Sequence, residues 1–253
     1  MLFSMCLILF GYRIAPDRPL IVAANRDEFH ARRSSQAAFW QEDSNVLAGR
    51  DEVAGGTWLG CTRNGRFAAL TNFSDPDDSV APSSRGELVQ GFLLGTDTAE
   101  YYAHGLTGSA YAGFNLLLFD GSTLVYTSNR ATTEVLNPGF YGVSNAELGA
   151  RWPKCVDGAA NLARWVEAGF SHNNLIEMLR NQAVPSDHVL PHRGRPVELE
   201  RRVAPCFILG DEYGTRASTI VEMGQQLINF SEQSYAAAGV ASGRVAYEFE
   251  VID

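Results

Sequence analysis

Residues 21–29 read I-V-A-A-N-R-D-E-F, an apolar run that gives way to four polar or charged side chains. Small and β-branched residues followed at once by such side chains are typical of a buried strand that ends at a functional site. A second apolar run, residues 6–12, precedes it, and residues 15–19 between the two runs are rich in turn-forming residues. The three segments predict a β-hairpin centred near Asp17.

This hairpin would bring two reactive groups together. In a hairpin, the residue numbers of two paired positions add up to about twice the number of the residue at the turn centre. A turn centred at Asp17 therefore places Cys6 opposite Asp27 and Glu28. Cross-strand Cβ atoms in such pairs lie roughly 4.5–5.5 Å apart. The sequence therefore predicts a thiol beside a carboxylate at one end of two core strands.

Length and composition limit the class of protein. The 253 residues predict a single domain over residues 1–253, although two small domains would also fit. Twenty basic against 29 acidic residues give a net charge of −9, which disfavours nucleic acid and anionic lipid as partners. No apolar run approaches the roughly 20 residues that cross a bilayer, so we expect no integral membrane segment. The oligomeric state is left open.

Localisation and metal binding follow from the N-terminus, cysteines and histidines. Residues 1–10 are apolar but lack the basic start of a secretory signal. The four cysteines lie far apart, which favours free thiols in a cytoplasmic protein. His188 and His192 have a spacing that metal sites use, but Pro191 prevents the helix that would align the two rings. We expect no metal site.

The rest of the chain alternates groups of strands with groups of helices. Helices are expected at residues 85–94, 98–104, 153–168 and 174–181. Surface loops are expected at residues 74–84 and 185–202. Further strands are expected at residues 57–62, 66–73, 114–119, 124–129, 141–145, 206–209, 217–223, 226–231 and 246–251. Strands segregated from helices in this way favour an α+β domain with antiparallel sheets and helices packed outside.

Cys6 is the candidate nucleophile. A thiol needs a base to take its proton, and none of the five histidines stands in an evident pair with it. An α-amino group, with a reference pKa of about 7.7–8.0, would serve if Cys6 were the first residue of the mature chain. Met5 directly before Cys6 fits removal of an initiator methionine. Because residues 1–5 precede Cys6, either translation starts at Met5, or these residues are removed, or Cys6 has no free α-amine. The structural alternative is a buried strand cysteine.

Other candidates have alternatives of the same kind. Arg26 and Asp27 would anchor a substrate carboxylate and orient an amine, or form a structural ion pair. Asn72 and Asn145 each end an expected strand and would donate to an oxyanion, or only form turns. Arg216 begins a strand and would otherwise be a solvated arginine.

Ten short segments, in order, carry a resemblance to a known family. They are Met5-Cys6, 24–29 (ANRDEF), 47–51 (LAGRD), 55–60 (GGTWLG), 66–72 (RFAALTN), 84–89 (SRGELV), 113–117 (GFNLL), 141–145 (YGVSN), 152–154 (WPK) and 213–219 (YGTRAST). Together they resemble the NRDE family, also called the transport and Golgi organisation protein 2 family.

The resemblance implies an N-terminal-nucleophile hydrolase-like αββα sandwich, in which two antiparallel sheets lie face to face between helices. In the related bile-salt hydrolases and penicillin V acylases, an N-terminal cysteine attacks an amide carbonyl. The catalytic matches that this likeness implies are Cys6 as nucleophile, Asp27 as the residue that orients its amine, Asn145 and, more weakly, Asn72 as oxyanion donors, and Arg216 near the thiol. The candidate substrate-binding residues are Asn25 and Arg26.

One departure from those hydrolases concerns an arginine. They carry it three residues before the aspartate, where this chain has Ala24. Arg26 is the nearest substitute, but neighbouring residues of a strand point to opposite faces, so it would not lie on the side of Asp27.

Two functions from different classes follow. The first is a Cys-dependent amidohydrolase for a small-molecule amide, which requires no cofactor. The second is a non-catalytic protein that binds haem or a lipid-like ligand, because members of the family are associated with haem handling and with Golgi organisation. The chain lacks a Cys-x-x-Cys-His haem attachment sequence, so haem would bind reversibly, with Met5, Cys6 and His30 as axial candidates.

Overall fold

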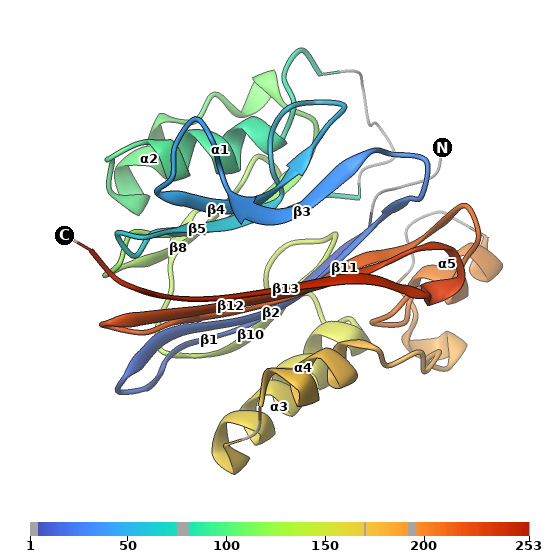
Figure 1. The fold of residues 1–253 in the computed structure, drawn as a ribbon. Helices are drawn as coiled ribbons and strands as arrows, with labels where there is room; N and C mark the ends of the chain where they lie inside the picture. The colour runs from blue at the N-terminus through green and yellow to red at the C-terminus, as the bar shows by residue number, and fades with distance from the viewer. Residues whose placement is uncertain (1–4, 75–80, 170, 192–195, 253) are drawn as a thin grey trace.

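A computed structural model describes residues 5–74, 81–169, 171–191 and 196–252. Two β-sheets lie face to face, and helices cover the outer face of each (Figure 1). The strand pairs within both sheets are antiparallel. This arrangement confirms the predicted four-layer αββα sandwich.

The six-stranded sheet contains the hairpin at the N-terminal end. Its order is β10-β1-β2-β11-β12-β13. The bounds are β1 Cys6–Ala15, β2 Arg18–Phe29, β10 Gly139–Val143, β11 Tyr213–Met223, β12 Leu227–Tyr235 and β13 Ala241–Glu250. Because β2 pairs with β1 on one side and with β11 on the other, Asn25 and Arg26 are enclosed by two neighbouring strands, while Asp27 and Glu28 pair with β11.

The seven-stranded sheet follows the chain order from β3 to β9. Its bounds are β3 Ser34–Phe39, β4 Val46–Asp51, β5 Leu59–Thr62, β6 Phe67–Asn72, β7 Phe114–Phe119, β8 Leu124–Ser128 and β9 Glu134–Val135. An Asn64-Gly65 turn joins β5 to β6, with Gly65 at a φ of 80°, which glycine adopts at little cost.

Two pairs of helices cover the sheets. Helices α1 (Gly86–Leu94) and α2 (Ala99–Gly105) pack on the seven-stranded sheet. Helices α3 (Pro153–Ala168) and α4 (His172–Leu179) pack on the six-stranded sheet (Figure 1). A fifth helix, α5 (Val197–Val203), precedes β11 in the second half of the chain.

Side chains of the inner strands alternate between the two layers. Val22 and Ala24 of β2 face the other sheet in the shared core, whereas Ile21 and Ala23 contact the layer of α3 and α4. This alternation decides on which side of the sheet each residue of the N-R-D-E segment lies.

The predicted pairing of Cys6 with Asp27 and Glu28 is wrong, since Cys6 pairs with Arg26. The turn lies between Ala15 and Arg18, and a shift in register between Tyr12 and Ala15 gives β1 one more residue than β2. Arg13 in this stretch has a φ of 50°, which is uncommon for a residue with a side chain. Asp27 instead donates its backbone N–H to the carbonyl of Met5, at 3.0 Å.

Two other segments differ from expectation, and a third is described only in part. Residues 206–209 form no strand, and the supposed surface loop at residues 185–202 contains most of α5. Acidic residues in the first turn of α5 and basic residues in its last turn match the helix dipole, a signal that the neighbouring prolines and charges concealed. Of the expected loop at residues 74–84, residues 75–80 lie outside the described residues.

Gly142 allows β10 to approach α3 closely, and this approach positions the residues that follow β10. A Cβ atom at Gly142 would lie 2.5 Å from the carbonyl oxygen of Cys155 and 2.8 Å from its Cα atom. Both are backbone atoms, so relief requires the helix or the strand to move.

We expect Gly142→Ala to lower the free energy of unfolding by about 1–3 kcal/mol, the usual cost of overpacking. Gly105→Ala is the matched control, because a Cβ atom there meets nothing within 4 Å. Urea unfolding of the two variants measures the difference, and equal stabilities would contradict the close approach.

Candidate functional site

Cys6 is held at the end of the six-stranded sheet by Asn145 and its neighbour Ser144. The Cys6 backbone N–H donates to Asn145 Oδ1 at 3.3 Å, and its carbonyl accepts from Ser144 Oγ at 2.6 Å. Asn145 Nδ2 donates to the Asn72 carbonyl at 2.7 Å, which ties this end of the site to the other sheet. The structure therefore brings Cys6, Asn72 and Asn145 together from distant parts of the chain.

Asp27 lies fully buried on the opposite side of the sheet from Arg26. Its Oδ1 accepts a hydrogen bond of 2.6 Å from Thr215 Oγ1. Burial raises the pKa of Asp27 from 3.8 to about 7, although the positive charge of Lys154 and the Thr215 hydrogen bond oppose the rise. A carboxyl group with this pKa exchanges a proton near neutral pH.

The thiol of Cys6 is protonated at neutral pH in the chain with Met5 attached. Burial and then the Asp27 charge raise the pKa of Cys6 to about 12, and a hydrogen bond from the Asp27 backbone offsets part of the rise. Because the nitrogen of Cys6 is then an amide, it has no basic lone pair. The thiol in this form is a poor nucleophile.

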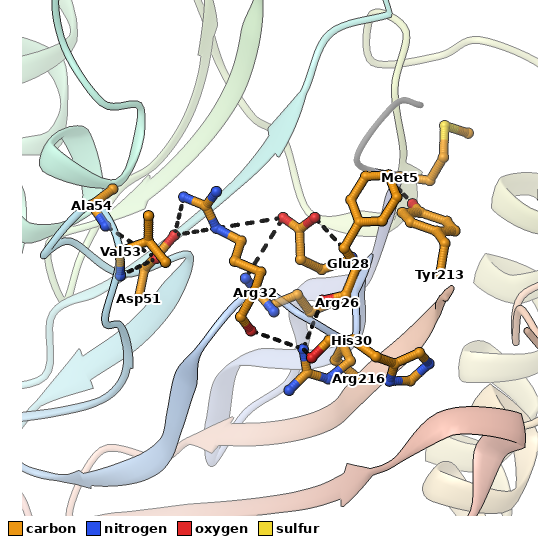
Figure 2. Close-up of polar contacts among 11 residues, drawn as sticks. Met5, Arg26, Glu28, His30, Arg32, Asp51, Val53, Ala54, Tyr213 and Arg216 are labelled. Carbon is orange, nitrogen blue, oxygen red and sulfur yellow. Dashed lines mark hydrogen bonds and ion pairs between the residues drawn. The ribbon is translucent and has the colours of Figure 1, made fainter. Parts of the chain in front are cut away.

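Met5 fills a small apolar recess next to Cys6. It is 1% exposed and packs with Val203, Ile208 and Tyr213. Its N–H donates to Tyr213 Oη at 2.6 Å, as Figure 2 shows. Tyr213 and Thr215 were not predicted as site residues, although both belong to the Y-G-T-R-A-S-T segment that carries the family resemblance.

Arg26 faces the other sheet with Cys6, as expected from its alternation with Asp27. Its guanidinium lies 4.5 Å from the ring centre of Trp58, and its Nη2 lies 3.7 Å from Glu28 Oε2. Arg32 approaches the same Glu28 oxygen at 3.8 Å and binds Asp51 at 2.7 Å (Figure 2).

Arg216 lies at a shift in register of β11, between Thr215 and Ala217. Its Nη1 donates to the carbonyls of Phe29 and Arg32 at 2.9 and 3.0 Å (Figure 2). The guanidinium thus holds the segment that follows β2. Burial and the neighbouring Arg26 lower the pKa of Arg216.

Asn25 faces the helix layer and has a structural role. Its Nδ2 donates to the carbonyls of Leu179 and Cys206 at 2.9 and 2.8 Å, and its Oδ1 accepts from Ser218 Oγ at 2.6 Å. With both of its N–H bonds used, Asn25 holds the end of α4 against the sheet. This geometry does not favour the predicted role in substrate binding.

A second polar cluster joins α4 to the sheet. His172 Nδ1 lies 2.5 Å from Ser231 Oγ, and His172 Nε2 lies 2.8 Å from Glu222 Oε1. These are the groups of a hydrolase triad. Ser231 is only 2% exposed, however, so we assign the cluster to the attachment of α4.

Metal and haem binding would each need ligating side chains gathered in one place. Among the described residues, no group of three or more His, Cys, Asp or Glu side chains could hold a metal ion, and His192 lies outside those residues. Both ring nitrogens of His30 lack a hydrogen-bond partner within the described part of the chain. Burial and then the charge of Arg216 lower the pKa of His30.

No helix in the described ranges is long and apolar enough to cross a membrane.

Fold and site together define an αββα sandwich with a cysteine at the start of an inner strand. The chain belongs to the Transport and Golgi organisation 2 family, which matches residues 5–237. The Transport and Golgi organization 2 homolog of Mus musculus is 35% identical over 258 residues, covering 91% of this chain and 93% of the mouse protein. The Homo sapiens homolog is 34% identical over 257 residues, with the same coverage of 91% and 93%.

Two solved structures have a related arrangement. A mutant form of conjugated bile acid hydrolase from Clostridium perfringens has a TM-score of 0.47 and 11% identity, with 96% of this chain and 92% of that chain covered. Penicillin V acylase from Agrobacterium tumefaciens has a TM-score of 0.41 and 13% identity, with 97% and 86% covered. At these scores the likeness supports no conclusion about chemistry.

The raised pKa of Asp27 predicts a pH-dependent stability. Between pH 4 and about 7 the folded chain holds a proton on Asp27 that the unfolded chain releases, so the free energy of unfolding falls as pH rises. At about 1.4 kcal/mol per unit of pKa, the loss is on the order of 4 kcal/mol. Asp27→Asn keeps an acceptor for Thr215 and should abolish this slope.

Urea unfolding from about pH 4.5 to 8, the window that this pKa defines, measures the effect. Asp17→Asn is the control, because the Asp17 side chain is 74% exposed. If the wild-type chain and Asp27→Asn lose stability in parallel, Asp27 is ionised in the folded state and the assignment is wrong.

Proposed function

We propose that this chain is an N-terminal-cysteine amidohydrolase for a small-molecule amide, and that it is inactive while Met5 is attached. The observation that carries the proposal is the position of the Met5–Cys6 peptide bond. Its nitrogen faces Asn145 Oδ1 at 3.3 Å, and its carbonyl accepts from the N–H of Asp27 at 3.0 Å. Cleavage there would create an α-amine between the two residues that the proposal needs.

The free amine supplies the base that the site otherwise lacks. It would take the thiol proton, and the thiolate would attack the amide carbonyl to form a tetrahedral oxyanion. Collapse transfers the proton to the leaving amine and leaves a thioester on Cys6. Water then attacks the thioester, with the amine as base, and releases the acid.

Loss of Met5 would also provide a place for the substrate. The recess lined by Val203, Ile208 and Tyr213 would be vacated. Tyr213 Oη and the N–H of Asp27 would each lose the Met5 group that they bind. One aromatic hydroxyl and one backbone donor would then face the new occupant, next to the amide of Asn145. This arrangement supports binding of an acyl group with a modest apolar portion.

We expect a chain that begins at Cys6 to be acylated by an electrophilic ester, and a chain that retains Met5 to stay unmodified. Intact mass after incubation measures both. Cys6→Ala should abolish the adduct. Asn145→Ala should slow its formation about 10²–10³-fold, the usual loss for one oxyanion donor.

Asn161→Ala, on α3 and away from the site, is the control and should acylate at the parent rate. A Cys6-first chain that folds but forms no adduct contradicts the hydrolase proposal. Equal labelling of the Met5-containing chain contradicts the role of the amine.

Haem binding is a second proposal, which His30 favours because its ring nitrogens lack partners among the described residues. Titration of haem into the purified chain should give a saturable Soret shift. His30→Ala should weaken it, while His104→Ala, at an exposed position, should not. A spectrum of free haem throughout the titration excludes Met5, Cys6 and His30 as ligands together.

A further inference from the structure

A polar cavity of about 240 Å³ lies between the two sheets, on the side of β2 away from β1. It is lined by residues of β3 and by Trp58 on one side, and by residues of β2, β11, β12 and β13 on the other. Ser35 and Ser242 at its mouth are exposed, whereas Arg26 and Glu232 in its interior are buried. A small molecule can therefore enter from solvent.

Arg26 lines this cavity and carries a buried donor without a partner among the described residues. The residue is 6% exposed, and its Nη1 has no hydrogen-bond partner within the described part of the chain. A buried donor without a partner is costly, because it has lost its water and gained nothing in return. Arg216, whose guanidinium lies near that of Arg26 in Figure 2, also lines the cavity.

Three acids lie near these two cations. Asp51 neutralises Arg32, and Glu28 is shared between Arg26 and Arg32 at 3.7 and 3.8 Å. Glu232 accepts from the Ala37 N–H at 2.9 Å and from Thr219 Oγ1 at 3.1 Å, and burial raises its pKa. The carboxyl groups of Glu28 and Glu232 therefore offset part of the positive charge of Arg26 and Arg216.

Trp58 fixes the orientation of Arg26. Its ring packs so closely over Gly49 that a Cβ atom there would lie 2.4 Å from Trp58 Cη2. The guanidinium of Arg26 stacks on this ring at 4.5 Å, which leaves the edge of the guanidinium free to donate. The donor is thus positioned before any ligand arrives.

We propose that this cavity binds the carboxylate of a small organic acid, with Arg26 Nη1 as the main donor and Arg216 as the second cation. A planar carboxylate matches the edge of a guanidinium. Ser34 and Ser234 supply hydroxyl groups for the second oxygen. The inference stands apart from the proposed hydrolysis, since binding of an anion needs no amine at Cys6.

The test is a titration of the full chain with butyrate at constant ionic strength, followed by the NMR signals of the Trp58 indole and the Arg26 guanidinium. We expect saturable shifts that butyramide, the neutral isostere, does not produce. Arg26→Gln should weaken binding by about tenfold or more, as expected for loss of a charged hydrogen bond. Arg151→Gln, at an exposed position, should leave binding unchanged.

The Glu232→Gln variant should change the affinity for butyrate in the opposite direction. This test does not depend on whether Arg26→Gln folds. The substitution removes a competing negative charge, so butyrate should bind several-fold more tightly at about pH 8. Absence of saturable butyrate binding, equal binding of butyramide, or tighter binding of inorganic phosphate would each overturn the proposal. Cys6→Ala should bind butyrate normally, so a failed hydrolase assay and a failed binding assay can be told apart.

Discussion

The pairing of β1 with β2 is the constraint on which the rest of the site depends. Cys6 lies opposite Arg26, so Asp27 lies level with Met5. Thiol and guanidinium therefore face the second sheet, while the carboxyl group faces the helices. A shift of one residue in the pairing of β1 with β2 would exchange the side chains on the two faces of β2. It would place the Asp27 carboxylate in the cavity and bury Arg26 against Lys154. The register thus decides which chemistry each face of the sheet supports.

Much of the fold could be predicted from local patterns. The apolar runs that end in N-R-D-E, the Asn64-Gly65 turn and the helical spacing over residues 153–168 each depend on neighbours in the sequence. The segregation of strands from helices was sufficient to give antiparallel sheets with helices outside. The family resemblance then supplied the four layers, which the structure confirms.

The details that local patterns could not supply arise from irregular backbone and distant contacts. The one extra residue of β1 near Arg13 moved the register, and the shift in β11 re-aimed Arg216. Asn145 reaches Cys6 from 139 residues away, and Lys154 reaches Asp27 from the first turn of α3. The cavity depends on Trp58, Glu232 and Arg26 together, from three separated strands or loops, so no single segment signals it.

Whether the Cys6 nitrogen is an amide or a free amine affects the charged groups on the two faces of this end of the sheet differently. With Met5 attached, no cation at Cys6 offsets the desolvation of Asp27, and its pKa stays near 7. An ammonium group at that nitrogen would be an opposite charge beside the carboxyl group, which lowers the pKa of an acid and raises that of the amine. The site would then hold an ion pair on the helix side of the sheet, away from the polar cavity. On the other side, Arg26 would keep its free edge, because its partner Glu28 lies on the same face of β2. The alternation of one strand therefore allows an amine and an anion to be held within neighbouring residues without neutralising each other.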